Sequence, residues 1–212
     1  MAFRGFERTL SLSPGSGDAP ELAARLAAMA REALEDAQAA GEAPDLYVRS
    51  VNGRRGVPEQ SVTMPGPIVY TFDWGPRAAA VALGQLQQRA PVLTGAYRSG
   101  FFVLVNGSQA EPEDAPFGAS IVVTNDKPYS RKVQVGSKGF SDTRGMWDAA
   151  AAATQRLFPG VVRCRVVFIR LEGGYSLRRA DRSRRRSRGL RSAGAELSYP
   201  AIRIERAVSG WN

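Results

Sequence analysis

Three helical runs alternate with groups of β-like segments along the chain, and this order constrains the fold more than any other feature of the sequence. Apolar residues recur at helical spacing in residues 18–39, 76–89 and 145–158, and β-like runs occupy residues 45–51, 67–73, 97–106, 119–125, 163–171 and 200–206. Such an order is typical of an α+β domain. We therefore expect a mixed or antiparallel sheet packed with about three helices.

Capping and turn residues mark the ends of several of these runs. Asp18, followed three residues later by Glu21, predicts the start of the first helix, and Pro91 predicts the end of the second. Asn52-Gly53 predicts a tight turn between strands. The stripe of the first helix that we expect to face the core contains Leu22, Leu26, Met29 and Ala33.

The domain organisation follows from the segments that lack such patterns. Residues 1–17 end in SPGSG and predict a flexible arm, so residues 18–212 are expected to form a single α+β domain. Residues 107–118 combine Glu111, Glu113 and Asp114 with two prolines and predict an acidic, mobile loop. Residues 173–198 predict a mobile basic insertion, because their like charges repel one another.

The overall charge narrows the classes of partner. The 212 residues carry a formal net charge of +9, which favours nucleic acid, an anionic membrane or an acidic protein surface. The sequence contains no run of about 18 apolar residues that could span a bilayer, and we expect no membrane partner. The one cysteine, Cys164, lies in an apolar run and predicts a buried thiol in a reducing compartment.

The same composition disfavours an enzyme, a metal site or a cofactor. The chain has no histidine, so the commonest general base and the commonest zinc ligand are both missing. The carboxylates are scattered, and we expect them to cap helices and stabilise turns rather than to act in pairs; they include Asp18, Asp45, Asp73, Asp126, Asp142 and Asp148.

An arginine-rich run is the most conspicuous local signal. Its arginines are Arg178, Arg179, Arg182, Arg184, Arg185, Arg186, Arg188 and Arg191. Guanidinium groups at this density neutralise phosphates well, but a charge run of this kind is also often no more than a solvated loop. Aromatic residues are not interleaved with the arginines, so the run favours a non-specific electrostatic role toward DNA or toward an acidic neighbouring surface.

Three junctions between helices and strands combine proline and glycine with a few polar residues. They are APVLTGAYRS at residues 90–99, VVTNDKPYSRKVQVG at residues 122–136 and SYPAI at residues 198–202. Pro91 ends a helix, Gly95 permits a sharp change of direction, and Pro128 restricts the next turn. Each junction predicts a structural corner, and none presents a nucleophile beside a base.

At these corners the sequence resembles the tail-completion, or neck, proteins of tailed bacteriophages, which include head-tail joining and minor tail proteins. The resemblance is carried by APVLTGAYRSGFFVLVNG, VVTNDKPYSRKVQVG, GMWDAAAAATQRLFPG and SYPAIRI, which follow one another in the order found in that family and span residues 60–206 with their surroundings. Here Ser130 replaces the usual alanine, and residues 133–135 lack the usual glutamate.

The resemblance implies a structural virion protein that forms a closed ring in the phage neck and allows DNA to pass. Such a ring, of about six or twelve copies, joins the capsid connector to the tail or terminates the tail tube. The implied partners are further copies of the chain, a portal-side connector or adaptor protein, and a tail-tube or tail-terminator protein, with non-specific contact to transiting DNA. The implied location is the head-tail junction of the virion, after synthesis in the host cytoplasm.

The residues that this resemblance assigns to subunit or partner contacts lie at the first two corners. They are Thr94, Gly95, Arg98, Asn125, Pro128, Tyr129, Arg131 and Lys132. We expect Tyr129, Arg131 and Lys132 to project toward an adjacent subunit or the lumen, and residues 1–17 and 178–191 to clasp neighbours or approach DNA. The alternative is a stand-alone basic module that binds nucleic acid, and an enzyme is the least favoured class.

Overall fold

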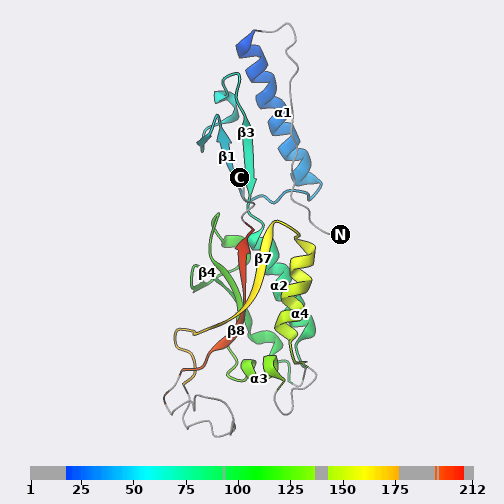
Figure 1. The fold of residues 1–212 in the computed structure, drawn as a ribbon, viewed down its shortest axis with the longest axis vertical. Helices are drawn as coiled ribbons and strands as arrows, with labels where there is room; N and C mark the ends of the chain where they lie inside the picture. The colour runs from blue at the N-terminus through cyan, green and yellow to red at the C-terminus, as the bar shows by residue number, and fades with distance from the viewer. Residues whose placement is uncertain (1–17, 93, 137–142, 177–193, 195, 208–212) are drawn as a thin grey trace.

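The chain folds into two lobes along one axis (Figure 1). A computed structural model describes residues 18–92, 94–136, 143–176, 194 and 196–207. The N-terminal lobe, residues 18–72, holds one helix and a three-stranded sheet, and the C-terminal lobe, residues 75–207, holds three helices and a five-stranded sheet. The strand pairs of both sheets are antiparallel. The predicted α+β class is therefore confirmed. The arm 1–17 and the arginines of 178–191 lie outside the described residues.

The N-terminal lobe begins with helix α1 (Ala19–Ala39). The Asp18 carboxylate accepts a hydrogen bond from the Glu21 amide at 3.1 Å, which is the predicted cap. The buried side of α1 is shifted by about one residue from the stripe that the sequence predicted, which contained Leu22, Leu26, Met29 and Ala33. These four residues are only half-buried, and the buried side of α1 consists of Ala27, Ala30, Leu34 and Ala37. Mostly alanine on this side lets the helix axis approach the rest of the lobe closely.

The small sheet confirms the predicted tight turn at Asn52-Gly53. Strand β1 (Tyr47–Val51) pairs with β2 (Arg54–Arg55) and with β3 (Ile68–Phe72) in the order β2-β1-β3. Asn52 and Gly53, with φ of 50° and 77°, form the turn between β1 and β2. Two positive φ angles in succession match the twist of a hairpin.

A buried carboxylate links the strands of this lobe. Glu59, in the short 3₁₀ helix η1 (Glu59–Ser61), is only 4% exposed. Its two oxygens each lie 2.8 Å from Arg49 Nη1, and Tyr70 Oη donates to Oε1 at 2.8 Å. Burial by itself raises the pKa of Glu59, but the hydrogen bonds from Arg49, the backbone and Tyr70 outweigh it and leave the pKa lowered. The ionised form is therefore the one that the fold stabilises.

We expect Glu59→Gln to lower the stability of the protein by about 2 kcal/mol at neutral pH, because charge-assisted hydrogen bonds to Arg49 are lost. A lowered folded pKa means that this contribution is complete above the unfolded carboxyl pKa of about 4.3 and disappears as the pH falls through the folded value. Denaturant titrations at several pH values should show the wild-type and variant curves converging in acid. Glu113→Gln, at an exposed carboxylate, is the control, and a constant difference at all pH values would contradict the assignment.

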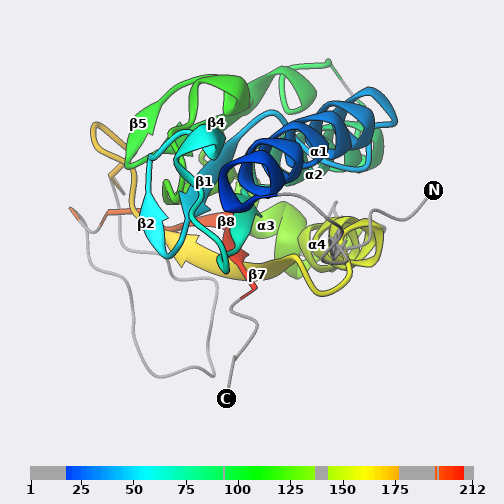
Figure 2. The same cartoon turned by 90° about the horizontal axis from the view of Figure 1, so that it is seen from above.

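The larger sheet has the strand order β5-β4-β6-β8-β7. Its strands are β4 (Phe101–Val105), β5 (Ser108–Gln109), β6 (Ile121–Asn125), β7 (Val162–Ile169) and β8 (Tyr199–Arg206). Helices α2 (Gly75–Arg89) and α4 (Met146–Leu157) cover one face, and α3 (Ser130–Val135) lies at one end (Figures 1 and 2). Their shared core includes the fully buried side chains of Leu86, Ile121, Val123, Trp147, Phe158 and Ile202.

Two local predictions in this lobe were wrong. The predicted strand 97–106 begins as a 3₁₀ turn, η2 (Arg98–Gly100), and becomes β4 only at Phe101. The predicted mobile loop 107–118 instead contains β5 and a second 3₁₀ turn, η3 (Pro112–Asp114). Pro112 is buried against the lobe, and the Asp73 carboxylate accepts a hydrogen bond from the Gly118 amide at 2.7 Å. These two contacts attach residues 107–118 to the lobe, although the charge of the segment predicted a solvated loop.

Cys164 is half-buried on β7, and burial raises the pKa of its thiol to about 11. The prediction of a buried thiol was therefore only partly right. Within the described parts of the chain, no helix combines the length and the apolar character needed to cross a membrane.

Candidate interface site at the end of the five-stranded sheet

The first two predicted corners meet at the buried side chain of Asn125. This residue ends β6 and is fully inaccessible. Its Nδ2 donates to the Tyr97 carbonyl at 2.8 Å, and its Oδ1 accepts from the Lys127 amide at 2.9 Å and from Ser130 Oγ at 3.1 Å. One amide group thus joins the turn before β4 to the turn after β6, which are far apart in the sequence.

The two turns approach each other closely at Gly100, where a Cβ atom would meet side-chain atoms of Asn125, Asp126 and Lys127. A Cβ atom at Gly100 would lie 2.7 Å from Asp126 Oδ1 and 3.1 Å from Asn125 Oδ1. The Asp126 amide donates to the Gly100 carbonyl at 3.2 Å, so the backbones themselves are in contact here. A glycine at this position is therefore part of the corner and not merely a turn residue.

The third corner joins the same end of the sheet. Arg131, on α3, donates to Ser198 Oγ at 2.6 Å, and its guanidinium lies 4.9 Å from the centre of the Phe168 ring. Thr124 Oγ1 donates to the Pro200 carbonyl at 3.0 Å and is fully buried. All three predicted corners are thus brought together at one end of the C-terminal lobe, although no single motif predicted these contacts.

Aromatic rings connect the corners to the helical core. The ring of Tyr97 lies 5.6 Å from that of Tyr129 and 5.2 Å from that of Phe101, and Phe101 lies 5.6 Å from Trp147. Burial raises the pKa of Tyr97 to about 12, and the nearby Ser130 and Trp147 offset this effect only in part. Tyr97 Oη and Trp147 Nε1 are buried and have no hydrogen-bond partner of normal geometry among the described residues.

The predicted interface residues separate into exposed and internal groups. The exposed ones are Thr94, Arg98, Pro128 and Lys132, and Gly95 is half-buried with a φ of 78°. Asn125 is internal. Tyr129 and Arg131 are half-buried, and both contact their own chain: Tyr129 packs against Tyr97, and Arg131 contacts Phe168 and Ser198. That they also reach an adjacent subunit or the lumen stays a prediction. Contact of the exposed residues with a partner stays a prediction.

Sequence reasoning missed the role of Gln134, which lies where the resemblance called for a glutamate. Gln134 is 9% exposed, and its Oε1 accepts from the Trp147 amide at 3.1 Å while Nε2 donates to Asp148 Oδ2 at 2.6 Å. These contacts cap the start of α4, whose N-cap residue Gly145 has no side chain. The absence of a capping side chain before residues 146–157 was the available signal that another residue must supply it.

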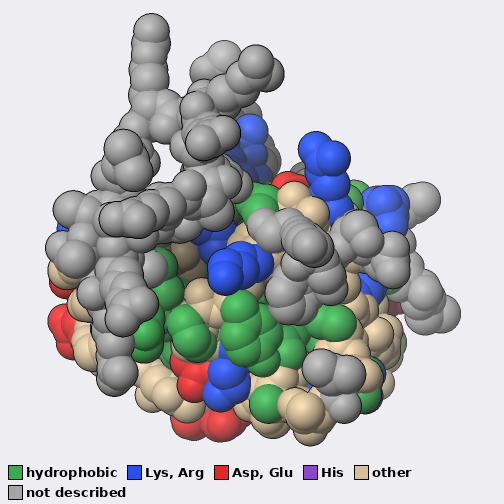
Figure 3. Space-filling view, turned by 90° about the horizontal axis from the view of Figure 1, so that it is seen from below, with side chains coloured by type: hydrophobic (Ala, Val, Ile, Leu, Met, Phe, Trp, Pro, Cys, Tyr) green, Lys and Arg blue, Asp and Glu red, His purple; other side chains and the backbone are tan. Residues whose placement is uncertain are grey.

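The outer surface of this end is mixed in character. Seen from below, it presents hydrophobic side chains next to lysine and arginine side chains, with aspartate and glutamate side chains toward its rim (Figure 3). Exposed apolar residues of the described chain in this lobe include Val92 at 64% and Val135 at 36%. Apolar groups interspersed with cationic ones are suited to a protein surface that is itself partly apolar and partly acidic.

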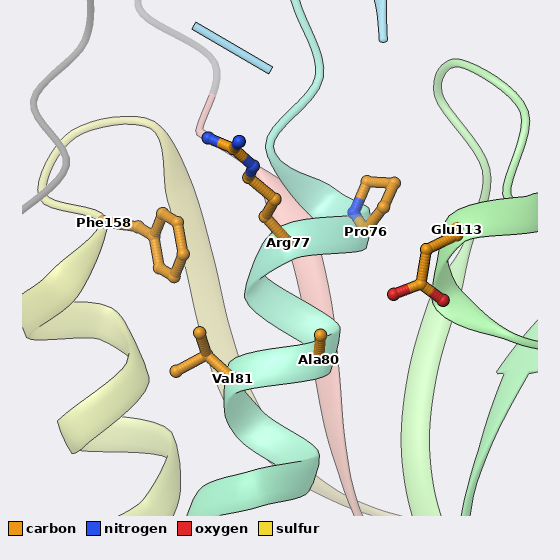
Figure 4. Close-up of a pocket in the computed structure, with 6 residues that line it drawn as sticks. All are labelled: Pro76, Arg77, Ala80, Val81, Glu113 and Phe158. Atoms are coloured by element: carbon orange, nitrogen blue, oxygen red, sulfur yellow. The ribbon is translucent and has the colours of Figure 1, made fainter. Parts of the chain in front are cut away.

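A shallow depression lies elsewhere, along the outer side of α2 (Figure 4). It has a volume of about 310 Å³ and is lined by Pro76, Arg77, Ala80, Val81, Glu113 and Phe158. Phe158 and Glu113 lie on opposite sides of α2, and Glu113 is the one carboxylate in a lining that is otherwise mostly apolar. This depression does not include any of the predicted interface residues.

The carboxylates of the described chain act as predicted at two positions. Asp18 caps α1, and Asp73 accepts hydrogen bonds from the Gly75 and Gly118 amides at 2.8 and 2.7 Å. Among the described residues, no group of three or more acidic or cysteine side chains is placed to hold a metal ion.

Comparison with known proteins found no match among family models, curated proteins or solved structures.

Proposed function

We propose that this chain is a structural virion protein of a tailed bacteriophage that forms an oligomeric ring in the neck. The ring joins the capsid connector to the tail, or terminates the tail tube, and DNA passes through it. The observation that carries the proposal is the convergence of three corners, at residues 94–99, 125–131 and 198–200, on one end of the sheet. These are the segments in which the sequence resembles phage neck proteins.

The construction of these corners supports a role in assembly. Buried hydrogen bonds from Asn125 hold the two turns together, so the exposed residues on those turns are presented in a fixed geometry. A rigid surface loses little conformational entropy when it binds. Thr94, Arg98, Pro128 and Lys132 are the residues placed to contact another subunit, a connector protein or a tail-tube protein.

The first test is the assembly state of the purified chain, alone and mixed with portal-side or tail-tube proteins. We expect discrete multimers by sedimentation velocity, with only weak binding to duplex DNA. A stand-alone nucleic-acid module would instead stay small and bind DNA with an affinity that falls steeply as salt rises. A chain that remains monomeric with its partners present and binds DNA tightly would overturn the proposal in favour of that alternative.

The arginine-rich run offers a second prediction. Replacing its eight arginines by serine should leave the protein folded but impair assembly into particles, because the run is proposed to contact neighbours or passing DNA. The unfolding curve and the yield of complete particles are the two measurements. An unchanged particle yield would show that the run has no role in assembly, and Arg54→Ser with Arg55→Ser provides a control at another exposed basic site.

A further inference from the structure

Strand β7 leaves one side of its backbone open. It is the last strand of the order β5-β4-β6-β8-β7, and β8 is its one strand partner in the described sheet. The Ala207 amide donates to the Val161 carbonyl, so the backbone groups of Val161 point toward β8. Because these groups alternate along an antiparallel strand, those of Val162, Cys164, Val166 and Phe168 point outward.

Only the first part of this outward edge is occupied. Gln155 Nε2 donates to the Val162 carbonyl at 2.6 Å, and its Oε1 accepts from the Cys164 amide at 2.8 Å. No hydrogen bond from the described residues reaches the outward backbone groups of Val166 and Phe168. The Phe168 side chain is also 47% exposed. An edge of this kind is a template for pairing with another strand.

The opposite edge of the same sheet is also incompletely covered. Strand β5 has only two residues, and Figure 2 shows it at the far side of the sheet from β7. The Ala110 amide donates to the Val103 carbonyl, so alternation directs the backbone groups of Gln109 outward. The exposed carboxylates of Glu111, Glu113 and Asp114 follow directly.

The two edges carry opposite charges. Arg163 and Arg165 are exposed on β7, and Arg170 follows directly. The side chain of Arg170 is 79% exposed and forms an ion pair with Glu196 at 3.7 Å, so Arg163 and Arg165 carry most of the positive charge of this edge. The acidic segment 111–114 lies beside β5. Pairing of β7 with the β7 of another copy would place arginines opposite arginines, which is unfavourable. Pairing of β7 with the β5 edge brings arginines near carboxylates instead.

We propose that β7 of one copy adds to the β5 edge of a second copy, with its arginines near the acidic segment 111–114 of that copy. The contact is heterologous, so it repeats from copy to copy until rotation closes a ring. This inference rests on the proposed ring function and names the two surfaces that would build the ring. It also identifies an assembly surface that adjoins the corners at Phe168, whose ring lies 4.9 Å from the Arg131 guanidinium.

The test uses two charge-reversed forms of the full chain. One carries Arg163→Glu and Arg165→Glu, and the other carries Glu111→Lys, Glu113→Lys and Asp114→Lys. Each alone should need roughly tenfold more protein to assemble, because like charges then face each other across every contact. A mixture of equal amounts should assemble as the wild type does, because alternating copies restore opposite charges at each contact.

Arg54→Glu with Arg55→Glu makes the same change in net charge as the first form, on a strand of the other lobe, and should assemble normally. Val166→Pro is a second probe, since proline removes an outward amide that has no partner in the described sheet. It should remain folded, as judged by circular dichroism, and lose assembly.

The outcomes separate this inference from the proposed function. Loss of assembly by each reversed form, with recovery in the mixture, supports the β7–β5 contact. Normal assembly of both reversed forms and of folded Val166→Pro overturns the contact but leaves the ring proposal standing. Failure of the mixture to recover, with both forms folded, also overturns it. A wild-type chain that forms no multimer under any condition overturns both.

Discussion

Replacing Asn125 by alanine is expected to lower the free energy of unfolding by about 3 kcal/mol. The side chain is completely buried, and its removal leaves the Tyr97 carbonyl, the Lys127 amide and the Ser130 hydroxyl without the hydrogen bonds that Asn125 makes to them. Each buried polar group left without a partner is destabilising by about 1–3 kcal/mol, and Ser130 can still bond the Lys127 carbonyl. Denaturant titration followed by circular dichroism measures the change.

Ser99→Ala is the matched control for this experiment. Ser99 lies in the same corner, but it is exposed, and its hydroxyl donates to the Ala96 carbonyl at 3.3 Å. Its removal should change the stability by no more than about 0.5 kcal/mol. If Asn125→Ala were as mild as Ser99→Ala, Asn125 would not be what joins the two turns. Assembly of Asn125→Ala should also be impaired, because the exposed corner residues would lose their fixed positions.

Trp147→Ala should be more damaging still, lowering the free energy of unfolding by about 4 kcal/mol. Trp147 is fully buried in the first turn of α4 and packs against Phe101 of the sheet, so alanine would leave a large cavity between helix and strand. The midpoint of denaturation should fall while the protein still unfolds cooperatively.

Trp147→Phe separates the size of this side chain from its polarity. Phenylalanine keeps most of the ring volume and removes the buried Nε1 donor, which makes no hydrogen bond of normal geometry among the described residues but lies close enough to Tyr97 to lower its pKa. We therefore expect less than half the effect of alanine. A phenylalanine variant as unstable as the alanine variant would mean that the indole N–H contributes a hydrogen bond, for example through a buried water molecule.

Local chemistry was enough to predict most elements of this fold. Asp18 begins α1, the turn at Asn52-Gly53 joins β1 to β2, and the second helix stops before Pro91. Each of these features depends on backbone preferences of one to four residues, which the sequence expresses directly. The strand order β5-β4-β6-β8-β7 was not predicted, because it depends on which strands pair across long stretches of chain.

The candidate site was predicted only in part, because its residues contact partners that are distant in the sequence. Asn125, Pro128 and Gly95 were identified from their motifs, but the hydrogen bond from Asn125 to Tyr97 spans 28 residues and has no local signature. The resemblance suggested an outward position for Tyr129, whereas its ring is amphipathic and packs on Tyr97. A local view of the sequence made residues 107–118 look mobile.

Gln155, on α4, also affects which part of strand β7 can pair with another strand. By bonding the Val162 carbonyl and the Cys164 amide, it closes the beginning of the β7 edge to any incoming strand. In the proposed ring, pairing can start only at Val166, so one side chain on α4 acts as a stop that prevents the neighbour from sliding. A register shift of one residue would move every side chain of the added strand to the opposite face of the sheet. A strand that joins at the same offset in every copy would meet its neighbour at the same angle each time, which a closed ring requires.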